Sequence, residues 1–174
     1  VANFTILPTS GPVNWMWTAY YQQIFRANQV LTRVPDIDMD EGLRQRSLGQ
    51  AHFLRGLAYF NLVTNFQTAP LVTTVPENEE EYYPASASEE ELWAQVISDF
   101  KMAQSMLPIT FANVSGLDQG QIGRATKGAA TGFLGKSYLY TEQWGLAATE
   151  FEKLILGPEL NIYSLTDNYQ DNFG

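Results

Sequence analysis

Hydrophobic residues recur at helical spacing near the start of the chain. Between positions 14 and 34 they fall three or four residues apart, which places them on one face of a helix. That face carries, in order, Trp17, Tyr21, Ile24, Asn28 and Leu31. We expect this helix to begin near Asn14, after a turn-rich segment at residues 1–13. It should end at Pro35, because proline disrupts a helix interior.

The second predicted helix is longer and apolar on most of its sides. It runs from Asp40 to Phe66, and nine of the 13 residues from Ala51 to Val63 are hydrophobic. A helix of this kind is usually buried at the centre of a fold. Two prolines then frame a short extended stretch at residues 71–75, and an acidic loop follows at residues 77–84. The chain is therefore expected to contain at most one short strand.

The third predicted helix has a recognisable beginning and end. Ser88 and Glu91 have the spacing of a capping box, in which each side chain bonds the backbone N–H of the other residue. Pro108 ends the helix. Residues 109–123 contain three glycines, so we expect a loop there.

The last two predicted helices, at Arg124–Glu142 and Trp144–Leu156, form a pair with a known spacing. The residues that match the tetratricopeptide (TPR) pattern are Leu134, Gly135, Tyr138, Trp144, Ala147, Phe151 and Pro158. Small residues at Gly135 and Ala147 allow two antiparallel helices to approach closely. We therefore predict a TPR-like pair at about residues 124–158.

A weak internal repeat indicates a helical solenoid. Gly49, Ala51, Gly56, Ala58 and Tyr59 recur as Gly128, Ala130, Gly135, Ser137 and Tyr138, at a constant offset of 79 residues. Two copies of one helical unit produce such a repeat, and stacked units form a superhelix. The predicted fold is therefore all-α, with TPR-like helix pairs in an α–α superhelix and irregular loops. We expect one helical domain over residues 1–174, with an irregular tail at residues 161–174.

Composition narrows the range of partners. The chain has 174 residues, 45% of them hydrophobic, a formal net charge of −9 and no cysteine. An acidic surface repels phosphate backbones, so nucleic acid is not an expected partner. Without cysteine the chain has no disulfide, no thiolate metal ligand and no cysteine nucleophile. No segment approaches the roughly 20 apolar residues of a membrane span.

The sequence lacks the patterns of a metal site or a catalytic centre. Residues Asp36–Gly42 resemble the start of a calcium-binding loop, but Glu41 stands where glycine is needed and Ser47 where a bidentate glutamate is needed. We therefore expect a solvated turn and an acidic helix start there. No pair of carboxylates has the surroundings typical of a glycoside hydrolase. We expect no enzyme, no cofactor and no metal.

Three basic residues lie in or beside the apolar helices. His52 is the single histidine and should have a structural role, because no second histidine or cysteine is present to complete a metal site. Arg55 and Arg124 should each pair with a carboxylate or a helix end, since an unpaired charge is costly in an apolar setting.

Aromatic residues remain as candidates for ligand binding. Sugars present flat C–H faces that stack on aromatic rings, while amide and hydroxyl groups bond the sugar hydroxyls. Trp17 and Tyr21 belong to the buried face of the first helix, so we expect them in the core. Trp15, Tyr82 and Tyr83 are less constrained, and we predict that these three contact the ligand.

Several stretches of the chain resemble successive signatures of one family. They are WTAYYQQIFRAN at residues 17–28, GQAHFLRGLAYF at residues 49–60 and GRATKGAA at residues 123–130, joined by Pro70-Leu71, Asp99 and Leu107-Pro108. In this order they are similar to SusD/RagB-type proteins, and the chain resembles an N-terminal-side portion of such a protein. Gln50 and Gln67 depart from residues that are common in the family.

The resemblance implies a location, partners and a function. Family members are lipoproteins of the outer-membrane surface, and they lie as a lid over a TonB-dependent, SusC-like transporter. They capture oligosaccharides, or in some members peptides, and deliver them for import, as in polysaccharide utilisation. Their TPR-bearing half packs on the transporter. The alternative for this chain is a TPR-type protein-interaction scaffold without a small-molecule ligand.

Overall fold

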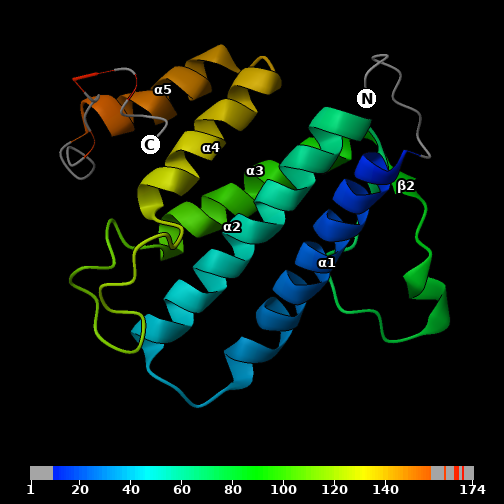
Figure 1. Cartoon of the computed structure of the whole chain (residues 1–174), viewed down its shortest axis with the longest axis horizontal. Coiled ribbons are helices and arrows are strands. Elements are labelled where there is room, and N and C mark those ends of the chain that lie inside the picture. Colours follow the sequence, from blue (N-terminus) through cyan, green and yellow to red (C-terminus); the bar gives the residue numbers. More distant parts are fainter. Residues whose placement is uncertain (1–9, 158–162, 164–166, 169, 171–174) are drawn as a thin grey trace.

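The computed structural model describes residues 10–157, 163, 167–168 and 170, and this part is mainly helical (Figure 1). The helices are α1 (Gly11–Arg33), α2 (Glu41–Phe66), α3 (Glu89–Met106), α4 (Lys127–Tyr140) and α5 (Trp144–Ile155). Shorter elements are the 3₁₀ helices η1 (Val34–Asp36) and η2 (Glu79–Tyr82) and the strands β1 (Ala69–Pro70) and β2 (Ser86–Ala87). None of the described helices is both long and apolar enough to cross a membrane.

Each long helix packs mainly on the next helix in the chain. Helix α2 contacts α1 and α3, and helix α4 contacts α3 and α5. In Figure 1 the α4–α5 pair and the loop that carries β2 lie on opposite sides of the long α1–α2 pair. Sequential packing of this kind is typical of helical superhelices, and the predicted all-α class with TPR-like helix pairs is confirmed.

Glycines mark the places where neighbouring helices approach most closely. A Cβ atom on Gly56 of α2 would lie 3.1 Å from the Cβ atom of Asp99 on α3. A Cβ atom on Gly135 of α4 would lie 2.8 Å from Cε1 of Phe151 on α5. These two glycines are related by the repeat offset of 79 residues. Both copies of the repeat therefore use glycine where the following helix packs.

The hydrophobic core lies between α2, α3 and α4. Tyr59 and Leu62 of α2 and Phe100 of α3 have no measurable exposure. A cluster of rings with centroids 5.4 to 5.8 Å apart is formed by Phe53, Phe60, Phe100 and Phe133. Helix α1 joins this core along one edge, where Ile24 is buried.

The helix boundaries differ from the predictions at two N-termini. Helix α1 begins at Gly11 rather than Asn14, because Pro12 lies in the first turn, where a missing N–H has no cost. Helix α4 begins at Lys127 rather than Arg124, after the Thr126 side chain accepts a hydrogen bond from the Ala129 N–H. The predicted capping box of α3 is confirmed.

The expectation of at most one short strand is wrong. Strands β1 and β2 pair in antiparallel fashion, with Ala69 opposite Ala87 and Pro70 opposite Ser86. Residues 71–75, predicted to be extended, have no regular secondary structure. Their carbonyls bond to helix side chains rather than to a partner strand. Of the other predictions, Pro158 and most of the tail at residues 161–174 lie outside the described residues.

Candidate ligand-binding site

An aromatic hollow lies between α1 and the loop that joins β1 to β2. Its volume is about 360 Å³. It is lined by Trp17, Tyr21, Pro70, Val72, Tyr82, Tyr83 and Pro84. Tyr82 and Tyr83 are 62% and 84% exposed, so both rings are available to a ligand. The structure thus brings two of the three predicted ligand-binding residues to one hollow.

Trp17 and Tyr21 form the helical wall of the hollow. Their ring centroids lie 5.1 Å apart, and Trp17 meets the ring of Phe66 at 5.0 Å. The Tyr21 hydroxyl donates a hydrogen bond of 2.7 Å to the Pro70 carbonyl. Burial, with Tyr59 nearby, raises the pKa of Tyr21 well above its ordinary value, so the hydroxyl stays a neutral donor. Both rings are half-buried rather than in the core as predicted, because α1 lies at the edge of the helix array.

Trp15, the third predicted residue, does not line the hollow. It is 74% exposed on α1. Trp15 lies two positions before Trp17 in the helix, which turns its side chain by about 200° around the helix axis relative to that of Trp17. A ligand contact by Trp15 therefore stays a prediction, and it would require a ligand that extends beyond the hollow.

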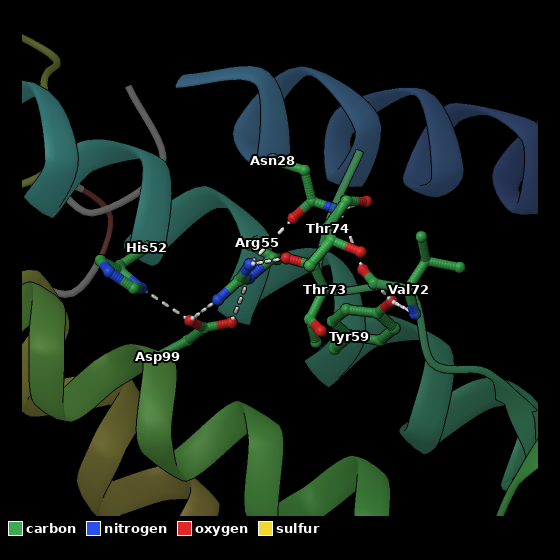
Figure 2. A network of polar contacts seen from close by, with 8 residues as sticks. All are labelled: Asn28, His52, Arg55, Tyr59, Val72, Thr73, Thr74 and Asp99. Atoms are coloured by element: carbon green, nitrogen blue, oxygen red, sulfur yellow. Dashed lines mark hydrogen bonds and ion pairs between the residues drawn. The ribbon is translucent and has the colours of Figure 1, made fainter. Parts of the chain in front are cut away.

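A buried polar network joins α1, α2 and α3 beside the hollow (Figure 2). Arg55 of α2 donates from Nε and Nη2 to the two oxygens of Asp99 on α3, at 2.9 and 2.8 Å. Its Nη1 donates to Asn28 of α1 at 2.8 Å and to the Thr73 carbonyl at 2.9 Å. The predicted pairing of Arg55 with a carboxylate is confirmed, and the same guanidinium also reaches the loop.

His52 completes this network on the side away from the loop (Figure 2). Its Nδ1 lies 2.8 Å from Oδ1 of Asp99. Burial alone would raise the pKa of Asp99, but hydrogen bonds from His52 and Arg55 and the charge of Arg55 lower it below its ordinary value. Asp99 is therefore a charged, fully bonded carboxylate, and the contact with it supports the structural role predicted for His52.

A second buried ion pair lies near the N-terminus of α2. Arg46 donates from Nε and Nη2 to the carboxylate of Asp118, at 2.7 and 2.8 Å. Arg124 lies near this pair, but its hydrogen bonds of 2.7 and 2.6 Å go to the amide oxygens of Gln50 and Gln121. Arg124 was predicted to pair with a carboxylate or a helix end, but these hydrogen bonds go to two glutamine side chains, and both oxygens of Asp118 accept from Arg46.

Comparison with known proteins places the chain in a family. The family model SusD-like_3, described as "Starch-binding associating with outer membrane", matches residues 3–139. The chain belongs to the SusD-like family. The resemblance found in the three sequence stretches is thereby confirmed.

SusD-like relatives are considerably longer than this chain. "SusD-like protein P38" of Formosa agariphila is 26% identical over 168 residues, which cover 95% of this chain and 30% of that protein. The solved structure of a "Laminarin binding SusD-like protein" has a TM-score of 0.85 and 35% identity, covering 99% of this chain and 36% of the other. A SusD-like carbohydrate binding protein from Bacteroides fragilis has a TM-score of 0.82 and 27% identity, covering 95% of this chain and 31% of the other. The chain thus spans about a third of the length of these relatives.

Two further hollows of the SusD-like chain are larger but offer less to a sugar face. One, of about 600 Å³, lies between α1 and α2 and includes Arg26 and Arg124. The other, of about 620 Å³, lies beside Trp93 and Tyr140. Trp93 is only 6% exposed, so among its described lining residues this hollow offers a sugar one accessible ring, that of Tyr140. The aromatic hollow is therefore the strongest candidate for stacking a sugar.

Among the described residues of this SusD-like chain, no three acidic, histidine or cysteine side chains are grouped to hold a metal ion. Within the predicted acidic turn, Asp40 Oδ1 accepts a hydrogen bond of 2.8 Å from the Leu43 N–H. Asp40 is therefore the N-cap of α2, which confirms the predicted turn and acidic helix start over Asp36–Gly42.

Sequence reasoning missed Pro70, Val72 and Asn28 as determinants of the hollow. Pro70 and Val72 carry no chemical signal, because they line the hollow only through the path of the loop. Asn28 did carry a signal, since it is the one amide on an otherwise apolar helix face. It is fully buried, and a buried amide must have hydrogen-bond partners.

Proposed function

We propose that this protein is a non-catalytic surface protein that captures a glycan and presents it to a TonB-dependent outer-membrane transporter. The observation that carries the proposal is the aromatic hollow, which is lined by the exposed Tyr82 and Tyr83 together with Trp17 and Tyr21. Its volume of about 360 Å³ lies in the range of small-molecule sites. Membership of the SusD-like family supports this reading.

The physical basis of the binding is stacking rather than charge. The chain has a net charge of −9, and a neutral glycan forms no ion pair with it. Affinity must then come from ring faces against C–H faces and from directional hydrogen bonds to hydroxyls. None of the residues that line the hollow is charged, which suits a neutral ligand.

Laminarin is the first ligand to test, because it is named for a SusD-like protein of 35% identity. Calorimetry of the protein at its natural full length should show binding of laminarin or another glycan of a panel. Tyr83→Ala should weaken binding roughly two- to tenfold, the value of one aromatic contact. Trp15→Ala tests the third predicted residue in the same way.

Ile122→Ala is the matched control, since Ile122 is fully exposed and does not line the hollow. It should leave the affinity unchanged. If Tyr83→Ala and a Tyr82→Ala/Tyr83→Ala double variant both bind like the wild type, the glycan site lies elsewhere. If peptides bind and no glycan of the panel does, the cargo is peptide instead.

We further propose an outer-membrane surface location with a lipid anchor, and docking of the helical surface on the transporter. The support is the family description, "Starch-binding associating with outer membrane", and a helical superhelix that offers an extended face. Purification of the tagged full-length protein from membranes in mild detergent should recover a large transporter. Recovery without such a partner would contradict the docking.

One observation favours the alternative of a TPR-type interaction scaffold. The groove between α1 and α2 is lined by Arg26, Arg124, glutamine amides, Ser47 and apolar residues, without a carboxylate among its described lining residues. Such a groove in an acidic chain suits an acidic protein segment. If Arg26→Glu abolishes recovery of a protein partner and no glycan or peptide binds, the scaffold reading is the correct one.

A further inference from the structure

The segment that enters the β1–β2 loop is bonded to the helices through its own carbonyls. Residues 71–75 form no regular secondary structure. Nevertheless, Asn28 Nδ2 donates to the Val72 and Thr74 carbonyls, each at 3.0 Å, and Arg55 donates to the Thr73 carbonyl at 2.9 Å. Three consecutive carbonyls are thus held by side chains of α1 and α2 (Figure 2).

Tyr59 adds a two-way contact with the same segment. Its hydroxyl donates to the Val72 carbonyl at 3.0 Å and accepts from the Val72 N–H at 2.7 Å. Together with the Tyr21 bond to Pro70 at the end of β1, these contacts fix Pro70 and Val72, which both line the hollow.

The side chains that hold this segment are themselves buried. Asn28 and Tyr59 have no measurable exposure, and Arg55 is 6% exposed. Arg55 is further locked by its two hydrogen bonds to Asp99, which is 1% exposed. The segment is therefore tied to α1 and α2 directly and to α3 through the ion pair.

Helix packing alone does not account for this network. The α2–α3 contact already contains apolar residues without exposure, such as Leu62 and Phe100. Buried ion pairs contribute little net stability compared with apolar residues of similar volume, and their best-attested benefit is conformational specificity. What this network specifies is the path of a segment whose carbonyls have no strand partner.

The described residues in the second half of the β1–β2 loop, around η2, are held by hydrogen bonds within the loop rather than by bonds to the helices. Around η2 the hydrogen bonds are local, from the Glu77 N–H to Glu81 at 3.0 Å and from the Asn78 side chain to Glu81. Tyr82 and Tyr83, which follow, are largely exposed. The hollow therefore has one wall anchored to the helix core and one wall that is held mainly by its own loop.

We infer that Asn28, Arg55 and Tyr59 are positioning residues that fix the 70–74 wall of the hollow before a ligand binds. This inference rests on the proposed glycan-binding function. Because this wall is already ordered in the free protein, less conformational entropy is lost when a ligand binds. The tyrosines of the opposite wall then adjust to the ligand.

Asn28→Asp is the decisive variant. A carboxylate of the same shape still accepts from Arg55 but cannot donate to the Val72 and Thr74 carbonyls. In the full-length protein its affinity for laminarin should fall about tenfold, the value of roughly two net hydrogen bonds. Tyr59→Phe, which removes only the hydroxyl, should weaken binding in the same direction.

Asp118→Asn is the matched control, because it disturbs the other buried ion pair and none of the residues that line the hollow. It should lower the melting temperature and leave the affinity for laminarin unchanged. A loss of affinity in the control equal to that of Asn28→Asp would overturn the inference, since general destabilisation would then explain both.

Amide exchange of Val72 provides a readout that needs no ligand. Because its N–H bonds to Tyr59, exchange should accelerate in Asn28→Asp and Tyr59→Phe and stay slow in Asp118→Asn. Unchanged exchange in both variants, or faster exchange with wild-type affinity, would overturn the positioning role. If the wild type binds no glycan, the proposed function fails, and the exchange rates alone decide whether these side chains fix the segment.

Discussion

Replacing two glycines of α4 by alanine tests the close contact of the TPR-like pair. Gly135 faces α5, and an alanine Cβ there would lie 2.8 Å from Cε1 and 3.0 Å from Cδ1 of Phe151. Gly132 lies on the same helix, three residues earlier, and its Cβ would lie 3.6 Å from Leu154, an ordinary van der Waals distance. Gly132→Ala is therefore a control with the same chemical change and no steric conflict.

The expected changes in unfolding free energy of the two variants follow from two opposing effects. Alanine in place of glycine within a helix stabilises by about 0.5–1 kcal/mol, and this gain is common to both variants. Overpacking costs about 1–3 kcal/mol and applies to Gly135→Ala alone. Gly132→Ala should therefore be slightly more stable than the wild type, and Gly135→Ala should be less stable than Gly132→Ala by about 1–3 kcal/mol.

Thermal unfolding of the three proteins under identical conditions measures this difference. Each kcal/mol of unfolding free energy corresponds to a shift in melting temperature of about 2–4 °C for a domain of this size, so the melting temperatures of the two variants should differ by several degrees. Gly135→Leu should widen the gap, because a ring shift of Phe151 cannot make room for four carbons. If Gly135→Ala melts together with Gly132→Ala, the two helices are not in close contact at this glycine.

Three further predictions concern caps and titrating groups. Ser88→Ala removes the side-chain acceptor of the α3 capping box and should lower the unfolding free energy by about 1 kcal/mol in denaturant titrations. An unchanged midpoint of denaturant unfolding would contradict the role of the cap. Asp99 and Asp118 have pKa values below their ordinary value, so the stability that they contribute is present above about pH 4 and is lost on further acidification. The melting temperature should therefore be lower at pH 3 than at pH 6, and this difference should be smaller in Asp99→Asn. Burial raises the pKa of Tyr59 to about 12, so the unfolding free energy should fall from about pH 10 to pH 12. Alkaline absorbance titration should show one late-ionising tyrosine fewer in Tyr59→Phe than in the wild type, with Tyr21 still ionising late in both.

The helices were predictable because their signals are local. Apolar periodicity, the Ser88–Glu91 capping box and the seven-residue glycine spacing within each copy of the repeat each depend on residues within a few turns. The N-terminus of α1 was missed because Pro12 resembles a turn signal as well as a first-turn residue. The β1–β2 pairing was missed because two-residue strands have no periodicity, and only the closure of the loop brings Ala69 opposite Ala87.

The candidate site was predictable only in part. Tyr82 and Tyr83 could be proposed from their position in a loop, but the partners of these rings depend on where the loop returns. Trp17 and Tyr21 share a helix face with buried residues, and periodicity does not tell a ring that is packed on both sides from one that is packed on one side. The pairing of Arg55 was predictable, whereas the amide partners of Arg124 depend on which arginine reaches Asp118.

The β1–β2 pairing makes the length of the loop independent of the packing of the helices. Because Ala69 and Ala87 are held opposite each other, the ends of the intervening segment stay adjacent whatever its length. Doubling the length of a closed loop costs only about 0.6 kcal/mol in closure entropy, less than many single core substitutions. Insertions and substitutions between Thr74 and Ser86 can therefore accumulate while the helix array stays intact. The same pairing makes this loop a suitable place to insert new sequences without disturbing the helices.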